Sequence, residues 1–124
     1  MKTKRILIVD DSPSMRQVLA RALSQAGYHT LEASDGLEAL ELLEDGEPIA
    51  LALIDVNMPR LDGIGLLRQL RAFEHMRAIP ILMVATETRR EKREEARVAG
   101  ATGWILKPFR PESVVSRVRD LLRG

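Results

Sequence analysis

The chain has 124 residues, 45% of them hydrophobic and 30% charged, which suits one compact domain over residues 1–124. Lys and Arg number 19 against 18 Asp and Glu, so a formal net charge of +1 gives no global attraction to nucleic acid or anionic lipid. The lack of cysteine excludes a disulfide framework, and the first apolar run, residues 6–9, is too short for a signal peptide or a membrane span. We therefore expect a soluble, cytoplasmic protein.

The first half of the chain alternates between strand-like and helix-like segments. After the strand at 6–9, Ser12 caps a helix, Pro13 lies in its first turn and Gly27 ends it. The apolar positions of this helix are Met15, Val18, Leu19, Ala22, Leu23 and Ala26. A strand at 28–33, a helix with Leu37, Leu40 and Leu43 on its apolar face that ends before Gly46, and a strand at 49–54 come next.

The second half repeats the alternation. Asp62 caps a third helix, and Pro80 opens a strand at 81–84. Thr88 and Glu91 have the spacing of a capping box that would open a fourth helix, which Gly100 ends. A fifth strand at 102–106 precedes a last helix that has Pro111 in its first turn and Val114, Val115, Val118, Leu121 and Leu122 on its apolar face.

Five successive strand and helix units predict an α/β fold of the (βα)5 type. Strands and helices that alternate in this way form a doubly wound, parallel, five-stranded sheet with right-handed crossovers. No linker, repeat or low-complexity tract interrupts the pattern. Ligands of such sheets bind in the crevice outside the carboxyl ends of the strands, so the functional site is expected there.

Chargeable residues follow three of the predicted strands at that edge. Asp10 and Asp11 follow the first strand, Asp55 the third, and Lys107 with Pro108 the fifth. Carboxylates brought together from separate strands repel one another, and a divalent cation would relieve that repulsion. As an alternative, Asp10, Asp11 and Asp62 could cap helices while Asp55 is an incidental residue at a strand end. That alternative leaves Asp55 and Lys107 at matching strand ends without a reason.

These residues lie in motifs that resemble the receiver domain of two-component response regulators. The motifs are Ile8-Val9-Asp10-Asp11-Ser12, Asp55-Val56-Asn57-Met58-Pro59 with Asp62-Gly63, and Gly100-Ala101-Thr102-Gly103-Trp104 leading into Lys107-Pro108-Phe109. The resemblance covers the whole chain and is strongest to the single-domain chemotaxis regulators of that family. It implies a flavodoxin-like sheet with the strand order 2-1-3-4-5.

A carboxylate can act as a nucleophile toward a phosphoryl donor, and Asp55 is the candidate phosphoacceptor. Phosphoryl transfer needs positioning and charge neutralisation, which points to Mg²⁺ as the cofactor. The resemblance implies that Asp11 and Asp55 bind Mg²⁺ directly, that the carbonyl of Asn57 adds a ligand, and that Asp10 acts through water.

The resemblance also assigns roles around the phosphoryl group. Lys107 would pair with the group once it is bound. Asn57 and Glu87 occupy positions that flank the phosphoryl group in this family and tune its hydrolysis by water. Because Asp55 is modified and then regenerated without turning over a separate substrate, the protein is expected not to be an enzyme in the usual sense.

The switch residues depart from the family pattern. Ala85 stands where receivers carry Ser or Thr at the end of the fourth strand, so the switch hydroxyl is missing. Thr86 could replace it only if the strand has already ended or bulged. Trp104 occupies the position of an aromatic that moves between exposed and buried states on activation, or it is a partly buried strand residue without a switching role.

The sequence as a whole predicts a stand-alone receiver that accepts a phosphoryl group from a histidine kinase and signals by binding a partner. The leading interpretation is chemotaxis, with a flagellar motor switch protein as the effector. The first alternative is a phosphorelay intermediate that passes the group to a histidine phosphotransfer protein, and the second is a binding module uncoupled from phosphorylation by Ala85. We expect a monomer without a membrane partner. A nucleic-acid partner is not expected either, because aromatic residues make up only 3% of the chain and offer no platform for stacking bases.

The predicted fourth helix leaves two interpretations open. It carries Arg89, Arg90, Lys92, Arg93 and Arg97 among three glutamates, with little apolar surface. Such a helix is typically solvated and laced with salt bridges. By resemblance, the same helix with the fifth strand and the last helix could instead form the surface that binds the partner.

Overall fold

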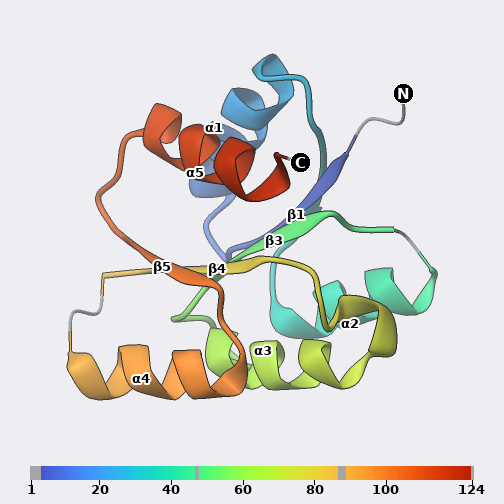
Figure 1. The fold of residues 1–124 in the computed structure, drawn as a ribbon, viewed down its shortest axis with the longest axis vertical. Helices are drawn as coiled ribbons and strands as arrows, with labels where there is room; N and C mark the ends of the chain where they lie inside the picture. The colour runs from blue at the N-terminus through green and yellow to red at the C-terminus, as the bar shows by residue number, and fades with distance from the viewer. Residues whose placement is uncertain (1–3, 47, 87–88, 124) are drawn as a thin grey trace.

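A computed structural model describes residues 4–46, 48–86 and 89–123. Five parallel strands form one sheet in the order β2-β1-β3-β4-β5 (Figure 1). The strands are β1 (Arg5–Val9), β2 (His29–Ala33), β3 (Leu51–Asp55), β4 (Ile81–Ala85) and β5 (Gly103–Leu106). The predicted α/β fold and its 2-1-3-4-5 strand order are confirmed.

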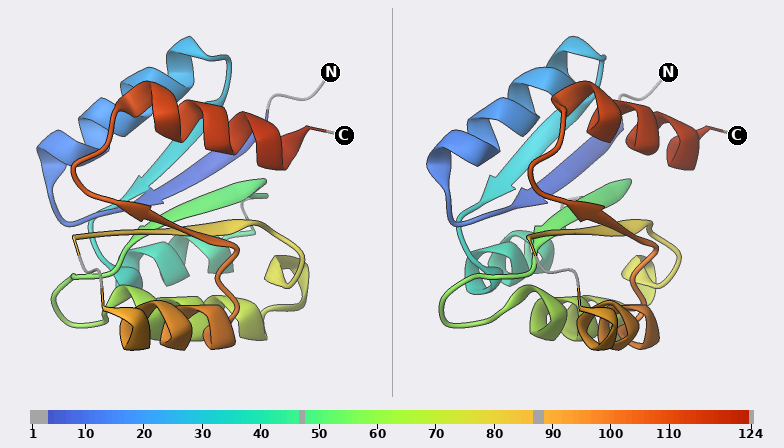
Figure 2. Two further views of the ribbon diagram at one scale, coloured as in Figure 1. Left: turned by 60° about the vertical axis from the view of Figure 1, so that its left-hand side comes forward. Right: turned by 90° about the vertical axis from the view of Figure 1, so that its left-hand side faces the viewer.

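Helices cover both faces of the sheet, as Figure 2 shows. One face carries α1 (Pro13–Gln25) and α5 (Pro111–Leu122), and the other carries α2 (Gly36–Glu44), α3 (Gly63–Ala72) and α4 (Arg90–Ala99). A short 3₁₀ helix, η1 (Glu74–Met76), follows α3 and was not expected from the sequence. No helix among the described residues is both long enough and apolar enough to cross a bilayer.

The sheet separates two apolar cores. Alternate strand residues point to opposite faces, so Leu7 and Ile54 pack toward α2 and α3 while Ile8 and Leu53 pack toward α1 and α5. The central strands are buried on both sides, which is why they read as continuous apolar runs. Within β1, β3 and β4 charged residues stand only at the strand termini, Arg5 at the start of β1 and Asp55 at the end of β3.

Most predicted helix boundaries follow from capping chemistry. The Ser12 side chain accepts a hydrogen bond from the Met15 amide at 3.3 Å, and Asp62 accepts one from the Gly65 amide at 2.7 Å. Gly100 ends α4 with a φ of 111°, which only glycine adopts without strain. The two N-caps fix where the loops at the carboxyl edge end and the following helices begin.

The structure corrects several details of the prediction. Arg89, and not Thr88, occupies the N-cap of α4 and makes no side-chain cap hydrogen bond, so the predicted capping box is wrong about that position; Thr88 itself lies outside the described residues. The predicted apolar stripes of α1 and α2 were too wide, because Val18 and Leu37 are 44% and 42% exposed at their edges. Strand β3 begins at Leu51, two residues later than predicted.

Candidate functional site

The carboxyl ends of β1 and β3 bring three carboxylates together. Asp10 and Asp55 are only 2% and 4% exposed, whereas Asp11 faces solvent. Each of the three offers a carboxylate oxygen, and these oxygens all lie within 4.8 Å of one another. Their predicted convergence at one edge of the sheet is therefore what the structure shows.

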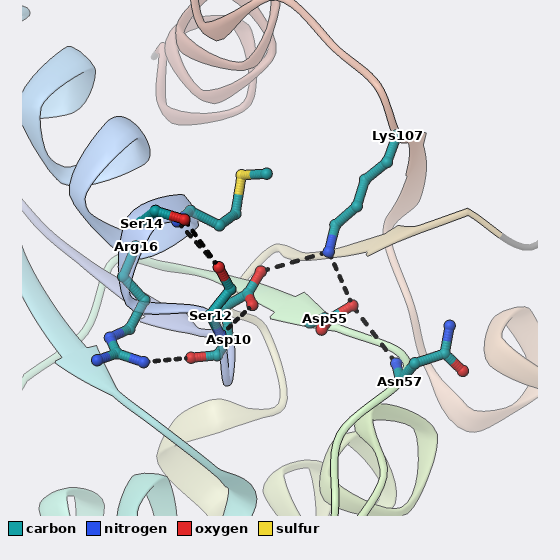
Figure 3. Close-up of polar contacts among 8 residues, drawn as sticks. Asp10, Ser12, Ser14, Arg16, Asp55, Asn57 and Lys107 are labelled. Atoms are coloured by element: carbon teal, nitrogen blue, oxygen red, sulfur yellow. Dashed lines mark hydrogen bonds and ion pairs between the residues drawn. The ribbon is translucent and has the colours of Figure 1, made fainter.

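Lys107 enters this acidic cluster from the end of β5. Its Nζ lies 3.3 Å from Oδ1 of Asp55 and 3.5 Å from Oδ2 of Asp10 (Figure 3). Its backbone amide donates to the carbonyl of Ala85 at 2.8 Å, which ties the lysine to the end of β4. One ammonium thus faces two buried carboxylates and a third nearby.

The electrostatics of the cluster leave Asp55 poorly compensated. Burial raises the pKa of the Asp55 carboxyl above its ordinary value of 3.8, and the negative charge of Asp10 raises it further. The ammonium of Lys107 and the amide of Asn57 lower the pKa but do not cancel these effects. The site is therefore short of positive charge.

Backbone amides hold the two buried carboxylates in place. The Ser12 amide donates to Oδ1 of Asp10 at 2.9 Å, and the Asn57 amide donates to Oδ1 of Asp55 at 3.4 Å. The Asn57 side chain is exposed and lies beside the cluster in Figure 3. Each aspartate is thus oriented by the loop that follows its own strand.

Gly63 supports the site in a way that its place in a motif did not reveal. It opens α3, its amide donates to the carbonyl of Val56 at 2.9 Å, and a Cβ at this position would lie 2.2 Å from the backbone oxygen of Asp55. Only glycine lets the helix pass this close to the strand end. A glycine directly after the helix cap Asp62 was the available signal for this close approach.

The predicted switch positions lie at the ends of β4 and β5. Ala85 is fully buried and is the last residue of β4, and Thr86 is exposed directly after it. The strand has therefore ended at Thr86, which meets the condition under which its hydroxyl could serve the site. Trp104 is half-buried on β5 and packs against the core beneath α3 and α4; Glu87 lies outside the described residues.

The residues of the cluster fit a hard divalent cation. Carboxylate oxygens are the ligands that Mg²⁺ prefers, and one exposed carboxylate leaves the cluster open to waters. The net excess of negative charge at Asp10 and Asp55 is of the sign that a cation would neutralise. The geometry thus supports a metal-binding acidic cluster.

Comparison with known proteins identifies the family. Residues 6–119 match the model of the response regulator receiver domain. The chain belongs to this family. The chemotaxis protein CheY-3 of Vibrio cholerae is 43% identical over 109 residues, which cover 87% of this chain and 83% of that protein. The chemotaxis protein CheY of Pseudomonas aeruginosa is 38% identical over 118 residues, which cover 94% of each.

The fold of this receiver is shared with solved structures. The structure of the chemotaxis protein CheY4 of Vibrio cholerae superposes with a TM-score of 0.93 at 38% sequence identity and covers 98% of this chain and 100% of that one. A receiver domain protein of Methanospirillum hungatei superposes with a TM-score of 0.91 at 29% identity. The chain is therefore a CheY-like receiver in sequence and in fold.

Proposed function

We propose that this receiver accepts a phosphoryl group on Asp55 from a histidine kinase in a Mg²⁺-dependent reaction and signals by binding a partner. One observation carries the proposal: the Asp55 carboxylate is buried within 4.8 Å of two further carboxylates and 3.3 Å from the ammonium of Lys107. This arrangement offers a nucleophile, a cation site and a partner for a phosphoryl oxygen within one cluster. Membership of the chain in the receiver family supports the same chemistry.

The transfer follows from the groups at the site. A carboxylate oxygen of Asp55 bonds to phosphorus while the bond from phosphorus to the imidazole nitrogen of the kinase's phosphohistidine breaks. The electron pair of that bond remains on the nitrogen, which takes up a proton. Lys107 then pairs with an oxygen of the new acyl phosphate.

Mg²⁺ would be held by Asp11, Asp55 and the carbonyl of Asn57, with Asp10 acting through water. The bound ion would neutralise negative charge on the transferred group. Water later attacks phosphorus, releases inorganic phosphate and restores the Asp55 carboxylate. Asn57 and Glu87 tune this hydrolysis. The protein is thus a phosphoacceptor that assists its own modification and hydrolysis, not a multiple-turnover enzyme.

We propose chemotaxis in the cytoplasm as the setting, with a flagellar motor switch protein as the downstream partner. Two relatives that match most of this chain are named chemotaxis proteins, which favours that setting. Transfer to a histidine phosphotransfer protein would use the same site and is the second candidate. The buried Ala85 in place of a hydroxyl favours a third candidate, a receiver whose partner binding does not depend on phosphorylation.

The direct test is incubation with acetyl phosphate, with and without Mg²⁺, followed by intact mass measurement. We expect a Mg²⁺-dependent phosphate adduct on the wild type and none on Asp55→Asn. An equal adduct on Asp55→Asn would contradict the proposed phosphoacceptor, and an adduct that forms equally without Mg²⁺ would contradict the metal requirement. Asp62→Asn, which keeps a helix cap outside the cluster, serves as the control and should form the adduct normally.

The three settings differ in what happens after the adduct forms. Binding to a motor switch peptide that tightens on phosphorylation supports chemotaxis. Reversible transfer of the phosphoryl group to a histidine phosphotransfer protein supports a relay. Partner binding of equal affinity with and without the adduct supports the uncoupled module.

A further inference from the structure

Arg16 reaches from α1 toward the acidic cluster but has no place in the chemistry described above. Its Nη1 donates to the backbone carbonyl of Asp10 at 2.6 Å (Figure 3). That carbonyl belongs to the peptide group that joins Asp10 to Asp11. Arg16 therefore contacts the one peptide whose orientation relates two of the three carboxylates of the cluster.

A second anchor fixes the Arg16 side chain. Its Nε lies 3.4 Å from Oε1 of Glu32 on β2, and the side chain is only 17% exposed. The Asp10 amide also bonds to β2, donating to the carbonyl of Ala33 at 3.2 Å. Both backbone groups of Asp10 are thus tied to β2. The amide bonds to Ala33 directly, and the carbonyl is connected to Glu32 through Arg16.

This restraint opposes a force that the cluster itself generates. The carboxylates of Asp10, Asp11 and Asp55 lie within 4.8 Å of one another, and like charges at that separation repel. Rotation of the peptide between Asp10 and Asp11 would let the exposed Asp11 swing toward solvent and relieve the repulsion. A carbonyl bonded to a guanidinium cannot rotate without losing a charge-assisted hydrogen bond.

We infer that Arg16, pinned by Glu32, is a positioning residue that holds the peptide between Asp10 and Asp11 so that their carboxylates stay arranged to bind a divalent cation. The inference rests on the proposed function, because it concerns the cation that the proposal places in this cluster. Groups that orient metal ligands typically contribute 10- to 100-fold to metal affinity. We expect an effect of about tenfold for Arg16, the lower end of that range.

A purely electrostatic role of Arg16 predicts the opposite sign. A guanidinium near a cation site repels the cation, so removing its charge alone would strengthen Mg²⁺ binding. A positioning role predicts weaker binding on removal. Arg16→Lys separates the two, because it keeps the charge but lacks the planar fork that bonds a carbonyl and a carboxylate together.

The experiment measures Mg²⁺ affinity by isothermal titration calorimetry on the wild type, Arg16→Met, Arg16→Lys, Glu32→Gln and the control Arg21→Met, which changes an exposed arginine further along α1. Thermal unfolding without Mg²⁺ is measured alongside for each protein. We expect Arg16→Met to bind about tenfold more weakly, Arg16→Lys and Glu32→Gln to bind several-fold more weakly, and Arg21→Met to match the wild type. Arg16→Met should unfold at a somewhat lower midpoint without Mg²⁺, because the Asp10 carbonyl loses its donor, but should remain folded at the temperature of the titration.

Wild-type protein that fails to bind Mg²⁺ would overturn the proposed metal site and this inference with it. Wild-type protein that binds, with Arg16→Met binding equally well or more tightly, would overturn this inference alone. Should Arg16→Met prove unstable without Mg²⁺, Glu32→Gln decides, since it releases the pin and leaves Arg16 in place. An unchanged Mg²⁺ affinity in Glu32→Gln would then contradict the proposed role of Arg16 and its ion pair with Glu32.

Discussion

Buried charge is left in excess at one edge of the sheet and is fully hydrogen-bonded to the backbone at the other. At the carboxyl edge, Asp10 and Asp55 are almost fully buried, lie close to a third carboxylate and share one ammonium. At the amino edge, the guanidinium of Arg71 is partly buried on α3 and donates several hydrogen bonds to backbone carbonyls. Charge that is satisfied by the protein's own backbone holds the fold together, whereas charge left in excess is available to a ligand.

Arg71 joins three segments at the amino edge. Its Nη1 donates to the carbonyl of Ile79 at 2.7 Å and also to that of Met76, just before β4 begins. Its Nε and Nη2 donate to the carbonyl of Gly100, the C-cap of α4, at 3.0 and 2.7 Å. Burial lowers the pKa of the Arg71 guanidinium, yet the group stays charged because a guanidinium is not deprotonated in proteins.

The largest effect on stability is expected from Arg71→Met. It removes the guanidinium that donates to the carbonyls of Ile79 and Gly100, which should lower the free energy of unfolding by about 3 kcal/mol and the midpoint by roughly 10 °C. Mg²⁺ affinity should not change, because the acidic cluster lies at the other edge. The control Arg68→Met removes only an exposed ion pair with Glu95 and should lower stability by less than about 1 kcal/mol.

Denaturant unfolding of both variants checks this prediction. Equal losses for Arg71→Met and Arg68→Met would show that the backbone contacts at the amino edge carry no special weight. A large loss of Mg²⁺ affinity in a folded Arg71→Met would show that the two edges are not independent.

The next largest effect is expected from Gly63→Ala at the carboxyl edge. The new Cβ would lie 2.2 Å from the backbone oxygen of Asp55, so the start of α3 must shift, at a loss of about 2–3 kcal/mol. That shift moves Asp55, so adduct formation with acetyl phosphate should also slow. In the control Gly65→Ala the nearest atoms to the new Cβ belong to side chains, Leu61 at 3.0 Å and the N-cap Asp62 at 3.1 Å, so a shift of a few tenths of an ångström accommodates it and a change within about 1 kcal/mol is expected.

Intact-mass time courses and denaturant unfolding measure the two consequences of Gly63→Ala separately. If Gly63→Ala proved as stable and as reactive as Gly65→Ala, the close approach of α3 to the Asp55 backbone would not matter to the site.

Asp55→Asn is expected to change the free energy of unfolding by less than the variants above, and the change should depend on pH when Mg²⁺ is absent. The raised pKa of Asp55 means that the folded state holds its proton to higher pH than the unfolded state does, so stability contributed by this group is lost as pH rises through the folded pKa. Near pH 4 the two proteins should be nearly equal. At pH 7 the Asn variant should be more stable by on the order of 1 kcal/mol.

Asp35 provides the opposite case. A hydrogen bond from the Glu38 amide, together with the contact with Arg60, lowers its pKa, so its contribution to stability grows as pH rises. In Asp35→Asn the wild type should therefore become the more stable protein toward neutral pH. Thermal unfolding of the wild type, Asp55→Asn and Asp35→Asn between pH 4 and pH 7 tests these two opposite pH dependences. Parallel pH curves for Asp55→Asn and wild type would contradict the charge excess at the site.

The smallest structural change, Ala85→Thr, is expected to alter signalling more than stability. Its hydroxyl at the end of β4 would restore a donor beside the site and strengthen the fluorescence response of Trp104 to phosphorylation. Ala85→Val adds nearly the same volume as Ala85→Thr but no hydroxyl. It should leave the fluorescence response unchanged, and both variants should change the free energy of unfolding by no more than about 1–3 kcal/mol. Equal responses in the two variants and the wild type would show that Thr86 or a backbone amide already does this work.

The sequence predicted the features that depend on local pattern. Buried parallel strands must be apolar, so Asp55 and Lys107 stood out at strand ends, and the order of strands followed from family resemblance. The parts that were missed depend on tertiary contacts: Arg71 and Arg16 act through backbone carbonyls of other elements, which no spacing of residues reveals. The N-cap of α4 was misplaced because Arg89, a residue without capping propensity, occupies it.

The most direct test of the contrast between the edges is the thermal unfolding of wild type and Asp55→Asn at pH 7, with and without Mg²⁺. The account predicts that the Asn variant is the more stable protein without Mg²⁺. At a Mg²⁺ concentration tenfold above its dissociation constant, the wild type should gain about 1.4 kcal/mol and the difference should close or reverse, while the variant gains much less. Equal gains in both proteins, or a wild type that is already the more stable without Mg²⁺, would contradict the claim that the acidic cluster is held for a cation.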